Sequence, residues 1–285
     1  LSTAARDIWR QHSALVGARA PYATRSLQVF PSRSEHRFNN HKMRLNIEFT
    51  LGAPLGIARN LHLCPNCSVA MDGGLHPLSC KRGPGLTLTH HSVVGNLEQW
   101  IRGTTSFSTE REPRLVDSNG EYSRRSLRTD LRVFRRVGPQ PSTAFDVSIV
   151  NVHSSAARTA GTTTAAYVSH EDSSTLHPLD VSLRAARVRE QEKCSKYQAA
   201  CAAQPEPSEF APFVLELTGG WGTSTRRFLD VLSSGASSFY SLGELKSLQQ
   251  ACISSIACSF RHKVLQTLLE QVKKQLSLED VSAFV

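Results

Sequence analysis

The sequence predicts an α/β protein whose mixed four-stranded sheet is flanked by helices. Three strand-like runs follow one another at residues 106–116, 126–134 and 144–152. The run Asp117-Ser-Asn-Gly120, between the first two, is typical of a β-hairpin turn. A helical run at residues 183–203 then precedes an apolar strand at residues 212–218. A hairpin followed by a helical crossover to a further strand gives a mixed sheet.

The segments before the first strand are less regular. Residues 1–37 are polar, and residues 38–51 alternate apolar and polar side chains, a pattern that by itself favours a strand. Residues 52–86 are rich in Gly, Pro and Cys, as expected of a metal-binding loop. Residues 87–102 read as a helix that Thr87 or Thr89 could cap.

The second half of the chain is mainly helical. Residues 153–179 are rich in Ser, Thr and Ala without a usable period, and we expect a mobile loop. The pattern predicts a helix at residues 225–233, ending at Gly235. Ser241 and Glu244 form a capping box that opens a long amphipathic helix. We expect four regions, at residues 1–51, 52–86, 87–222 and 223–285.

Composition limits the class of protein. The 285 residues are 40% hydrophobic and carry a net charge of +9, which favours a polyanionic partner, nucleic acid before membrane. No apolar run approaches the ~18–20 residues that span a bilayer. Four of the seven cysteines lie in helical patterns, which argues against a disulfide framework and for a reducing, intracellular compartment. The chain begins with Leu and shows no signal-peptide organisation, so we expect a piece of a longer polypeptide.

Four potential metal ligands fall within 17 positions: Cys64, Cys67, His76 and Cys80. The two-residue spacing of the first pair lets both thiolates reach one ion from a tight turn, and Cys3His is a common closed zinc set. Because protein ligands fill all four positions, this zinc ion would be structural or would support DNA contact. The alternative is a loop with three unrelated free cysteines.

Two aspartates interrupt strongly β-type runs: Asp130 in Leu127-Arg-Thr-Asp-Leu-Arg132 and Asp146 in Ala144-Phe-Asp-Val. Aspartate is disfavoured in strands and costly when buried unpaired, so two on neighbouring strands suggest a shared Mg²⁺. A phosphodiester nuclease uses such an ion to activate water. Pairing with the many nearby arginines is an equally good explanation, and Arg128 and Arg132 would also suit phosphate binding.

Other candidate side chains surround this pair in the predicted topology. Glu112 could be a third acidic ligand, although a lone Glu before Pro is more often exposed. Glu190, Lys193 and Tyr197 share one helix face, and a lysine there could orient water or neutralise the transition state, unless the face is simply solvated. His90 and His91 could contact phosphate or a base, or be exposed polar residues.

The order of these motifs resembles a known family. Cys64-x2-Cys67-x8-His76-x3-Cys80 is followed by His90-His91, Arg111-Glu-Pro113, Arg128-Thr-Asp130, Phe145-Asp146-Val and Lys193-x2-Lys196-Tyr197. This series is similar to the restriction-like endonuclease region of site-specific non-LTR retrotransposon polyproteins, which lies downstream of the reverse transcriptase. The similarity covers about residues 38–235 and includes the Glu-Leu-Thr-Gly-Gly-Trp-Gly segment.

The resemblance implies a PD-(D/E)xK-type nuclease that nicks DNA with Mg²⁺ to prime reverse transcription, and a zinc knuckle that assists nucleic-acid binding. Asp130 and Asp146 would be its acids, Lys193 or Lys196 its displaced lysine, and Tyr197 the neighbour of that lysine. Thr129 stands where the family has proline, and Ser148 stands at the usual lysine position on the strand. The resemblance would also make residues 38–51 a helix, which we expect here.

We therefore expect a nuclear DNA endonuclease that works with DNA, and with element RNA, beside a reverse transcriptase of the same polyprotein. One alternative is a catalytically degenerate, zinc-containing nucleic-acid-binding remnant, which would bind DNA without metal-dependent cleavage. Another is a helical partner-binding module built on residues 241–277, whose association would survive loss of the zinc ligands.

Overall fold

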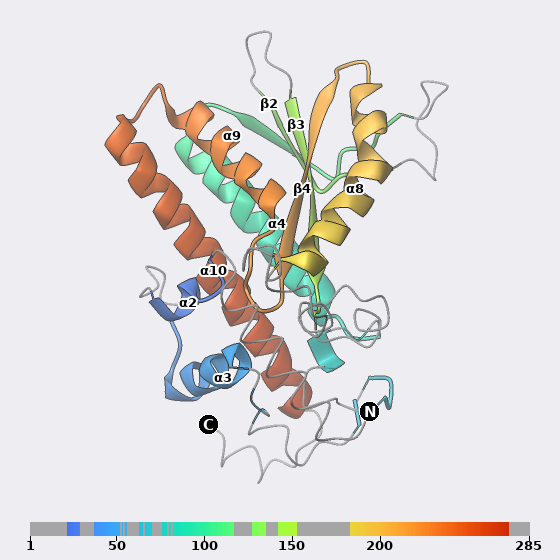
Figure 1. The fold of residues 1–285 in the computed structure, drawn as a ribbon, viewed down its shortest axis with the longest axis vertical. Helices are drawn as coiled ribbons and strands as arrows, with labels where there is room; N and C mark the ends of the chain where they lie inside the picture. The colour runs from blue at the N-terminus through green and yellow to red at the C-terminus, as the bar shows by residue number, and fades with distance from the viewer. Residues whose placement is uncertain are drawn as a thin grey trace, which may run out of the picture.

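A computed structural model gives the fold of most of the chain (Figure 1). The predicted hairpin turn at residues 117–120 and the predicted loop at residues 153–179 lie outside the described residues. None of the helices in the described part combines the length and apolar content that crossing a membrane requires. The described residues are 22–28, 37–51, 53, 55, 63–64, 66–69, 76–78, 80, 82–116, 127–134, 142–152 and 183–273.

Four strands form one mixed sheet in the order β1-β2-β3-β4. β2 pairs antiparallel with β1 and with β3, and β4 runs parallel to β3. The α/β class and the mixed four-stranded sheet predicted from the sequence are confirmed. The strands are β1 (Ser108–Arg111), β2 (Leu131–Phe134), β3 (Ser142–Val150) and β4 (Ser208–Glu216).

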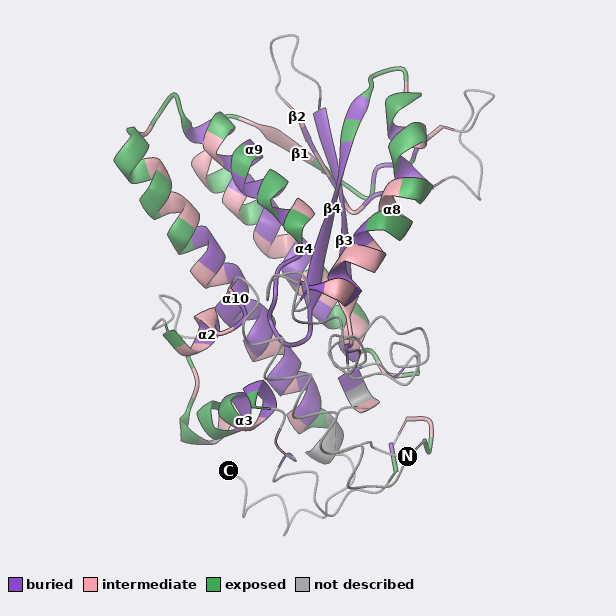
Figure 2. Ribbon diagram, viewed as in Figure 1, coloured by how far each residue is buried: buried purple, intermediate pink, exposed green. Residues whose placement is uncertain are grey.

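Helices cover both faces of the sheet. α8 (Arg184–Ala202) covers one face, where Tyr197 packs with Ala144 of β3 and Phe210 of β4. α4 (Gly85–Thr104) and α9 (Arg226–Ala236) cover the other, where Phe145 meets Phe228. β3 and β4 are therefore buried over most of their length (Figure 2). Because side chains alternate along a strand, Asp146 lies on the α8 face of β3.

α10 (Leu242–Lys273) is one long helix that packs along α4 and crosses most of the molecule (Figure 1). The predicted capping box at its start is confirmed. The backbone N–H of Ser241 donates to Glu244 Oε2 at 2.8 Å, and that of Glu244 reaches Ser241 Oγ at 3.5 Å. Reciprocal bonds of this kind satisfy N–H groups that have no partner within the helix.

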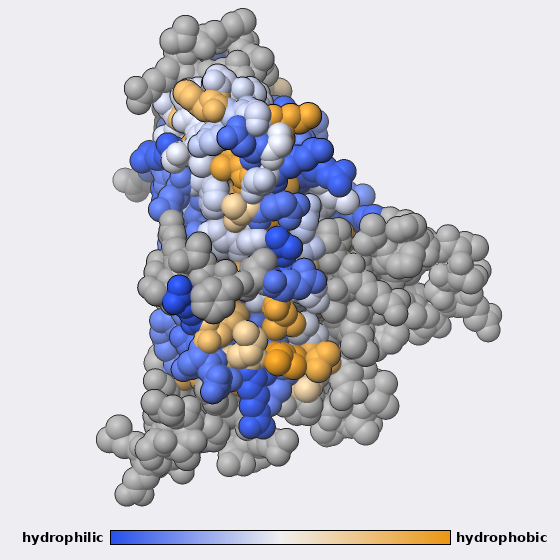
Figure 3. Space-filling view, turned by 90° about the vertical axis from the view of Figure 1, so that its left-hand side faces the viewer, coloured by the Kyte–Doolittle hydropathy of each residue, from blue (hydrophilic) through white to orange (hydrophobic). Residues whose placement is uncertain are grey.

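Residues 40–50 form a helix, α3 (Asn40–Thr50), beside the short α2 (Arg25–Gln28). Asn39 caps α3, and Leu45 and Phe49 face the core, so the helical expectation holds and the alternating pattern misleads. The side of the molecule that carries α2, α3 and α10 shows apolar patches among hydrophilic side chains (Figure 3). The exposed large apolar side chains here are Met43 and Ile47 on α3 and Leu51 at its C-cap.

Several element boundaries early in the chain differ from the predictions, among them the start of β2 at Leu131 instead of residue 126. β1 ends at Arg111, not at residue 116, because Glu112 adopts φ +49°, in the left-handed region that interrupts a strand. α4 begins at Gly85, where a Cβ would clash with Thr267 of α10. No side chain caps α4, and Thr89 Oγ1 donates back to the Gly85 carbonyl at 2.8 Å.

Later boundaries differ because of tertiary packing. β4 begins at Ser208 instead of residue 212, because its pairing with β3 extends back to Ser142. α9 continues through Gly235 to Ala236 instead of ending there. Gly235 lies so close to Phe107 that a Cβ would come within 2.7 Å of its ring. A close approach between elements, and not a helix end, accounts for this glycine.

The buried Arg261 of α10 holds the turn after β4. Its guanidinium donates to the carbonyls of Leu217 and Thr218 at 3.2 and 2.7 Å and lies over the Phe49 ring of α3. Gly219 in the same turn has φ +98°, and a Cβ there would come 2.6 Å from the Ala23 carbonyl. The sheet, α10, α3 and the segment before α2 therefore meet at one point.

Candidate metal centre and acidic site

The predicted Cys3His ligands come together in space. Their four ligand atoms, from Cys64, Cys67, His76 and Cys80, all lie within 4.8 Å of one another. Cys64 Sγ and Cys80 Sγ are 3.8 Å apart, the spacing of about 3.8 Å that two thiolates adopt on a tetrahedral ion with Zn–S bonds of ~2.3 Å. Cys67 Sγ and His76 Nε2 are 2.9 Å apart. The set can hold a zinc ion and leaves no open position.

Local backbone structure builds this cluster. The Cys64 N–H donates to the Val69 carbonyl at 2.7 Å, which closes a tight turn around Cys67. Burial raises the pKa of the Cys64 thiol, whereas a backbone hydrogen bond from Val69 lowers that of Cys67. Cys64 and Cys80 belong to the same buried core as α4 and α10. The metal-binding group is thus built into the main body of the fold.

Asp146 lies in the centre of the sheet, on the face that α8 covers. It is 4% exposed, and its Oδ2 pairs with Lys193 Nζ at 2.6 Å. Burial raises the pKa of Asp146, Lys193 opposes that rise, and the charge of Asp130 adds to it. Burial, together with the charge of the nearby Asp146 carboxylate, raises the pKa of Tyr197. The carboxylate is thus enclosed by two residues one helical turn apart.

Asp130 precedes β2, where its carboxylate meets β3 and α4. Its Oδ2 accepts the backbone N–H of Val147 at 2.6 Å and contacts His90 Nε2 at 3.1 Å. Burial lowers the pKa of His90, but the hydrogen bond and charge of Asp130, with the charge of Asp146, outweigh burial, so the net shift is upward. A helix on each side of the sheet therefore supplies a basic group to one of two neighbouring carboxylates.

The remaining residues predicted on α8 have distinct positions. Lys193, not Lys196, reaches Asp146, whereas Lys196 is exposed with its Nζ 4.8 Å from the centre of the Tyr197 ring. Glu190 accepts the Ser224 N–H at 2.8 Å and so supports the segment that leads into α9. The shared face predicted for Glu190, Lys193 and Tyr197 exists, but Glu190 has a structural role.

Glu112, Arg128 and His91 contact neighbours that the sequence did not indicate. Glu112 is exposed, with its carboxylate 4.0 Å from Arg128, and its backbone N–H donates to the Asp130 carbonyl. His91 is exposed and its ring lies edge-on to that of His90. The structure therefore brings the Glu112 backbone, but not its side chain, into hydrogen-bonding contact with Asp130.

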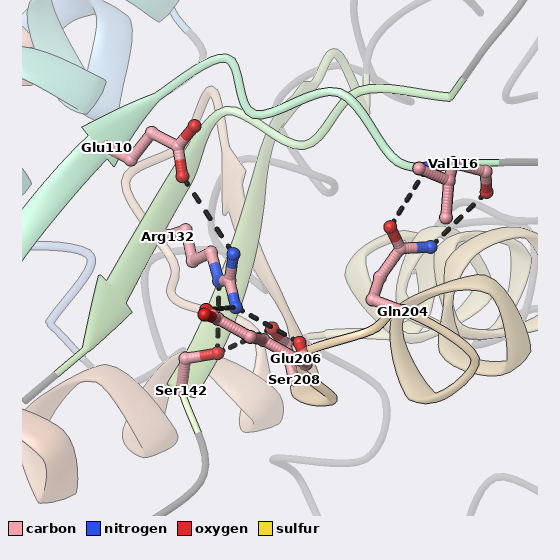
Figure 4. A network of polar contacts seen from close by, with 7 residues as sticks. All are labelled: Glu110, Val116, Arg132, Ser142, Gln204, Glu206 and Ser208. Carbon is pink, nitrogen blue, oxygen red and sulfur yellow. Dashed lines mark hydrogen bonds and ion pairs between the residues drawn. The ribbon is translucent and has the colours of Figure 1, made fainter. Parts of the chain in front are cut away.

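Arg132 belongs to a separate polar network at the far end of β2 and β3 (Figure 4). Its guanidinium donates to Ser142 Oγ at 3.0 Å and to the Glu206 carboxylate at 3.2 Å, and lies 4.0 Å from Glu110. The network borders a cavity of about 310 Å³. These partners give Arg132 a structural role, and its predicted contact with nucleic acid stays a prediction.

Sequence reasoning missed two features of the acidic site. The backbone N–H of Val147 fixes Asp130, and no side-chain pattern reveals such a bond. His90 contacts Asp130 across 40 positions of sequence, although it was assigned to nucleic acid. Within the described residues, only the Cys3His set brings three or more ligand atoms within 4.8 Å of one another. The aspartate pair is therefore not a closed metal cage.

No protein-family model matches the sequence, and a search of curated proteins gave no match. The resemblance to the retrotransposon endonuclease region therefore stays a prediction.

Proposed function

We propose that the chain is a metal-dependent DNA endonuclease that nicks one strand, with a zinc-bound Cys3His group that stabilises its nucleic-acid-binding end. The observation that carries the proposal is that Asp130, just before β2, accepts the N–H of Val147, the residue after Asp146, while Asp146 pairs with Lys193 of α8. A buried carboxylate beside a second carboxylate and a lysine is costly for a fold and suits a site for phosphodiester hydrolysis. The motif order described above supports the same reaction.

Each side chain has a role that follows from its position. Asp130 and Asp146 offer the hard oxygen ligands that Mg²⁺ prefers. A bound Mg²⁺ would supply Lewis acidity and a more acidic water. Lys193, 2.6 Å from Asp146, is placed to orient that water or to neutralise charge developing on the phosphate. Lys193 Nζ lies 5.4 Å from the centre of the Tyr197 ring, so Tyr197 helps to position the lysine that pairs with Asp146.

The proposed partners follow from charge and from the resemblance. The net charge of +9 favours DNA, and element RNA as a second polyanion. The retrotransposon-like motif order implies a reverse transcriptase in the same polyprotein and a nuclear site of action. Nicking would then provide the primer end for reverse transcription.

The second candidate is a zinc-containing nucleic-acid-binding remnant without activity. Contacts between the aspartates and basic side chains favour this candidate. Lys193 pairs with Asp146 and His90 contacts Asp130, so the charges of both carboxylates have partners without any metal ion. Thr129 and Ser148, which depart from the family motifs, favour it too. This candidate predicts salt-sensitive DNA binding without cleavage.

Nicking of supercoiled plasmid in Mg²⁺ tests the choice. The wild-type chain is compared with Asp146→Asn, with a chelated sample, and with Glu209→Gln, which removes an exposed carboxylate from the neighbouring strand β4. The proposal expects wild type and Glu209→Gln to nick, and Asp146→Asn and the chelated sample not to. Equal DNA binding by every protein without any nicking would support the remnant instead.

A further inference from the structure

The Arg132 network shown in Figure 4 borders a cavity of about 310 Å³ on the α8 face of the sheet. The strand register places Glu110, Arg132 and Ala144 side by side on three neighbouring strands, and all three line the cavity. Ala144 packs with Tyr197 of α8, which identifies the face. Because side chains alternate along a strand, Asp146 lies on the same face, about 7 Å further along β3. The cavity therefore adjoins the acidic site.

The hydroxyl of Thr129 points to a ligand in this cavity. Thr129 lines the cavity and is 1% exposed, and its Oγ1 has no hydrogen-bond partner among the described residues. A buried hydroxyl without a partner is costly to a fold, and a polar ligand in the cavity would remove that cost. The retrotransposon-like motif has proline at this position, so the hydroxyl is a feature of this chain and not of the motif.

The charges that line the cavity balance one another. Two arginines, Arg114 and Arg132, face two glutamates, Glu110 and Glu206. Arg132 Nη1 and the Glu110 carboxylate are 4.0 Å apart, beyond hydrogen-bond length, so each can bond a ligand placed beside them. A phosphate would meet both carboxylates and be repelled. The lining instead suits an uncharged ligand that has both donors and acceptors.

Apolar walls and a fixed rim complete the cavity. Pro113, Leu115 and Pro205 contribute apolar surface that suits the flat face of a ring. The Val116 N–H donates to Gln204 Oε1 at 2.9 Å, and Gln204 Nε2 donates to the Val116 carbonyl at 3.3 Å (Figure 4). These bonds join the end of α8 to the segment after β1. The walls are therefore held in place before any ligand binds, which lowers the cost of binding.

The size and polarity of the cavity fit a single nucleobase. Ligand pockets span ~300–1,000 Å³, and this cavity is at the small end of that range. Guanine alone among the four DNA bases has an acceptor, O6, followed by two adjacent donors, N1–H and N2–H₂, along one edge. A carboxylate can accept from both donors together while a guanidinium donates to the acceptor. Arg132 and Glu110, on paired strands, offer these two groups side by side.

We propose that this cavity binds a guanine base of the DNA strand, next to the phosphate that the acidic site cleaves. The proposal rests on the proposed function, because base and phosphate belong to the same strand. Glu110 accepts from N1–H and N2–H₂, Arg132 Nη1 donates to O6, and the Thr129 hydroxyl gains a partner. Contacts to base edges carry sequence information that phosphate contacts lack. The base enters unstacked, so single-stranded DNA is the preferred substrate.

Fluorescence anisotropy of labelled single-stranded oligonucleotides tests the assignment with the full, zinc-loaded chain. Mg²⁺ is left out, so binding is measured without cleavage. A thymine strand with one central guanine should bind roughly 5–150-fold more tightly than the all-thymine strand, the ratio expected of one two-bond base contact. Inosine, which lacks the N2 amine, should lose part of this preference. Equal binding of the guanine and all-thymine strands would overturn the assignment.

Two variants with a matched control separate the cavity from general DNA binding. Glu110→Gln should lose most of the guanine preference and keep its affinity for the all-thymine strand. Thr129→Val should reduce the preference roughly 2–10-fold, and it removes no hydrogen bond of the fold among the described residues. Glu209→Gln, a carboxylate on β4 outside the lining, should keep the full preference. A preference unchanged in both cavity variants would overturn the assignment.

Further outcomes separate this proposal from its alternatives. Guanosine monophosphate that binds as tightly as the strand would make a free guanine nucleotide the ligand and would overturn DNA as its source. A guanine preference without plasmid nicking would retain the cavity and remove the nuclease. Nicking without any guanine preference would do the reverse.

Discussion

Replacing Lys193 with methionine should lower the free energy of unfolding by about 3–5 kcal/mol, because the substitution leaves a buried carboxylate without its cation. Lys193 Nζ and Asp146 Oδ2 are 2.6 Å apart, and their side chains are only 13% and 6% exposed. Solvent screens such a pair weakly, so the loss should greatly exceed that of a surface ion pair. Methionine keeps most of the aliphatic volume, so the effect reports charge more than packing.

The loss should grow with pH. Burial raises the pKa of Asp146 and Lys193 opposes the rise, so its removal raises the pKa further. A folded-state pKa above that of the unfolded chain favours the protonated carboxyl in the fold. The stability of the variant is therefore retained at low pH and is lost as the pH rises through the folded-state pKa.

Urea unfolding followed by circular dichroism, in mildly acidic and mildly alkaline buffer, measures both effects. Lys196→Met is the matched control, since Lys196 is exposed one turn away and its loss should cost within about 0.5 kcal/mol. Equal losses in the two variants, or a loss for Lys193→Met that does not depend on pH, would refute the account of this ion pair.

Three further substitutions test the core and the metal group. Glu216→Gln should flatten the pH profile of stability, because burial raises the pKa of Glu216 from 4.5 to about 8. The protonated Glu216 carboxyl contributes fully to the free energy of unfolding below pH 4.5, and this contribution is lost as the pH rises toward 8. The whole change corresponds to about 5 kcal/mol, and urea unfolding at a series of pH values measures it. Cys80→Ser should remove bound zinc, by metal analysis, and lower the melting temperature, because Cys80 is buried in the main core. Gly219→Ala should cost about 1–3 kcal/mol in the same urea assay, because its φ is +98°.

Each of these expectations has a contrary result. Parallel pH profiles for wild type and Glu216→Gln would mean that Glu216 is ionised in the fold at neutral pH. Zinc retained by Cys80→Ser would remove that thiol from the ligand set. Wild-type stability in Gly219→Ala would show that the turn after β4 relaxes away from Ala23 and Arg261.

The sequence indicates most of this fold because many of its signals are local. The spacing of Cys64 and Cys67 places both thiols on one turn, and the Ser241–Glu244 box marks the start of α10 correctly. The aspartates could be located because acids in β-type runs are unusual. In each case the information lies within a few positions of the chain.

What the sequence could not indicate depends on how distant elements pack. Lys193 and Lys196 are equivalent candidates until the rotation of α8 is known, and burial of Tyr197 and Cys201 against the sheet sets that rotation. The glycine at position 235 is typical of a helix end, yet it is needed there because Phe107 packs too closely to leave room for a side chain. The role of His90 follows from the crossing of α4 over the start of β2.

The measurement that tests the central claim most directly is cleavage and DNA binding by Asp130→Asn, Asp146→Asn and the double variant. Residues that act as one metal site lose activity as a unit, so each single variant should cut as poorly as the double. DNA affinity at a fixed salt concentration should match wild type in all three. Cleavage that persists in the double variant would contradict the claim that these two aspartates perform the chemistry.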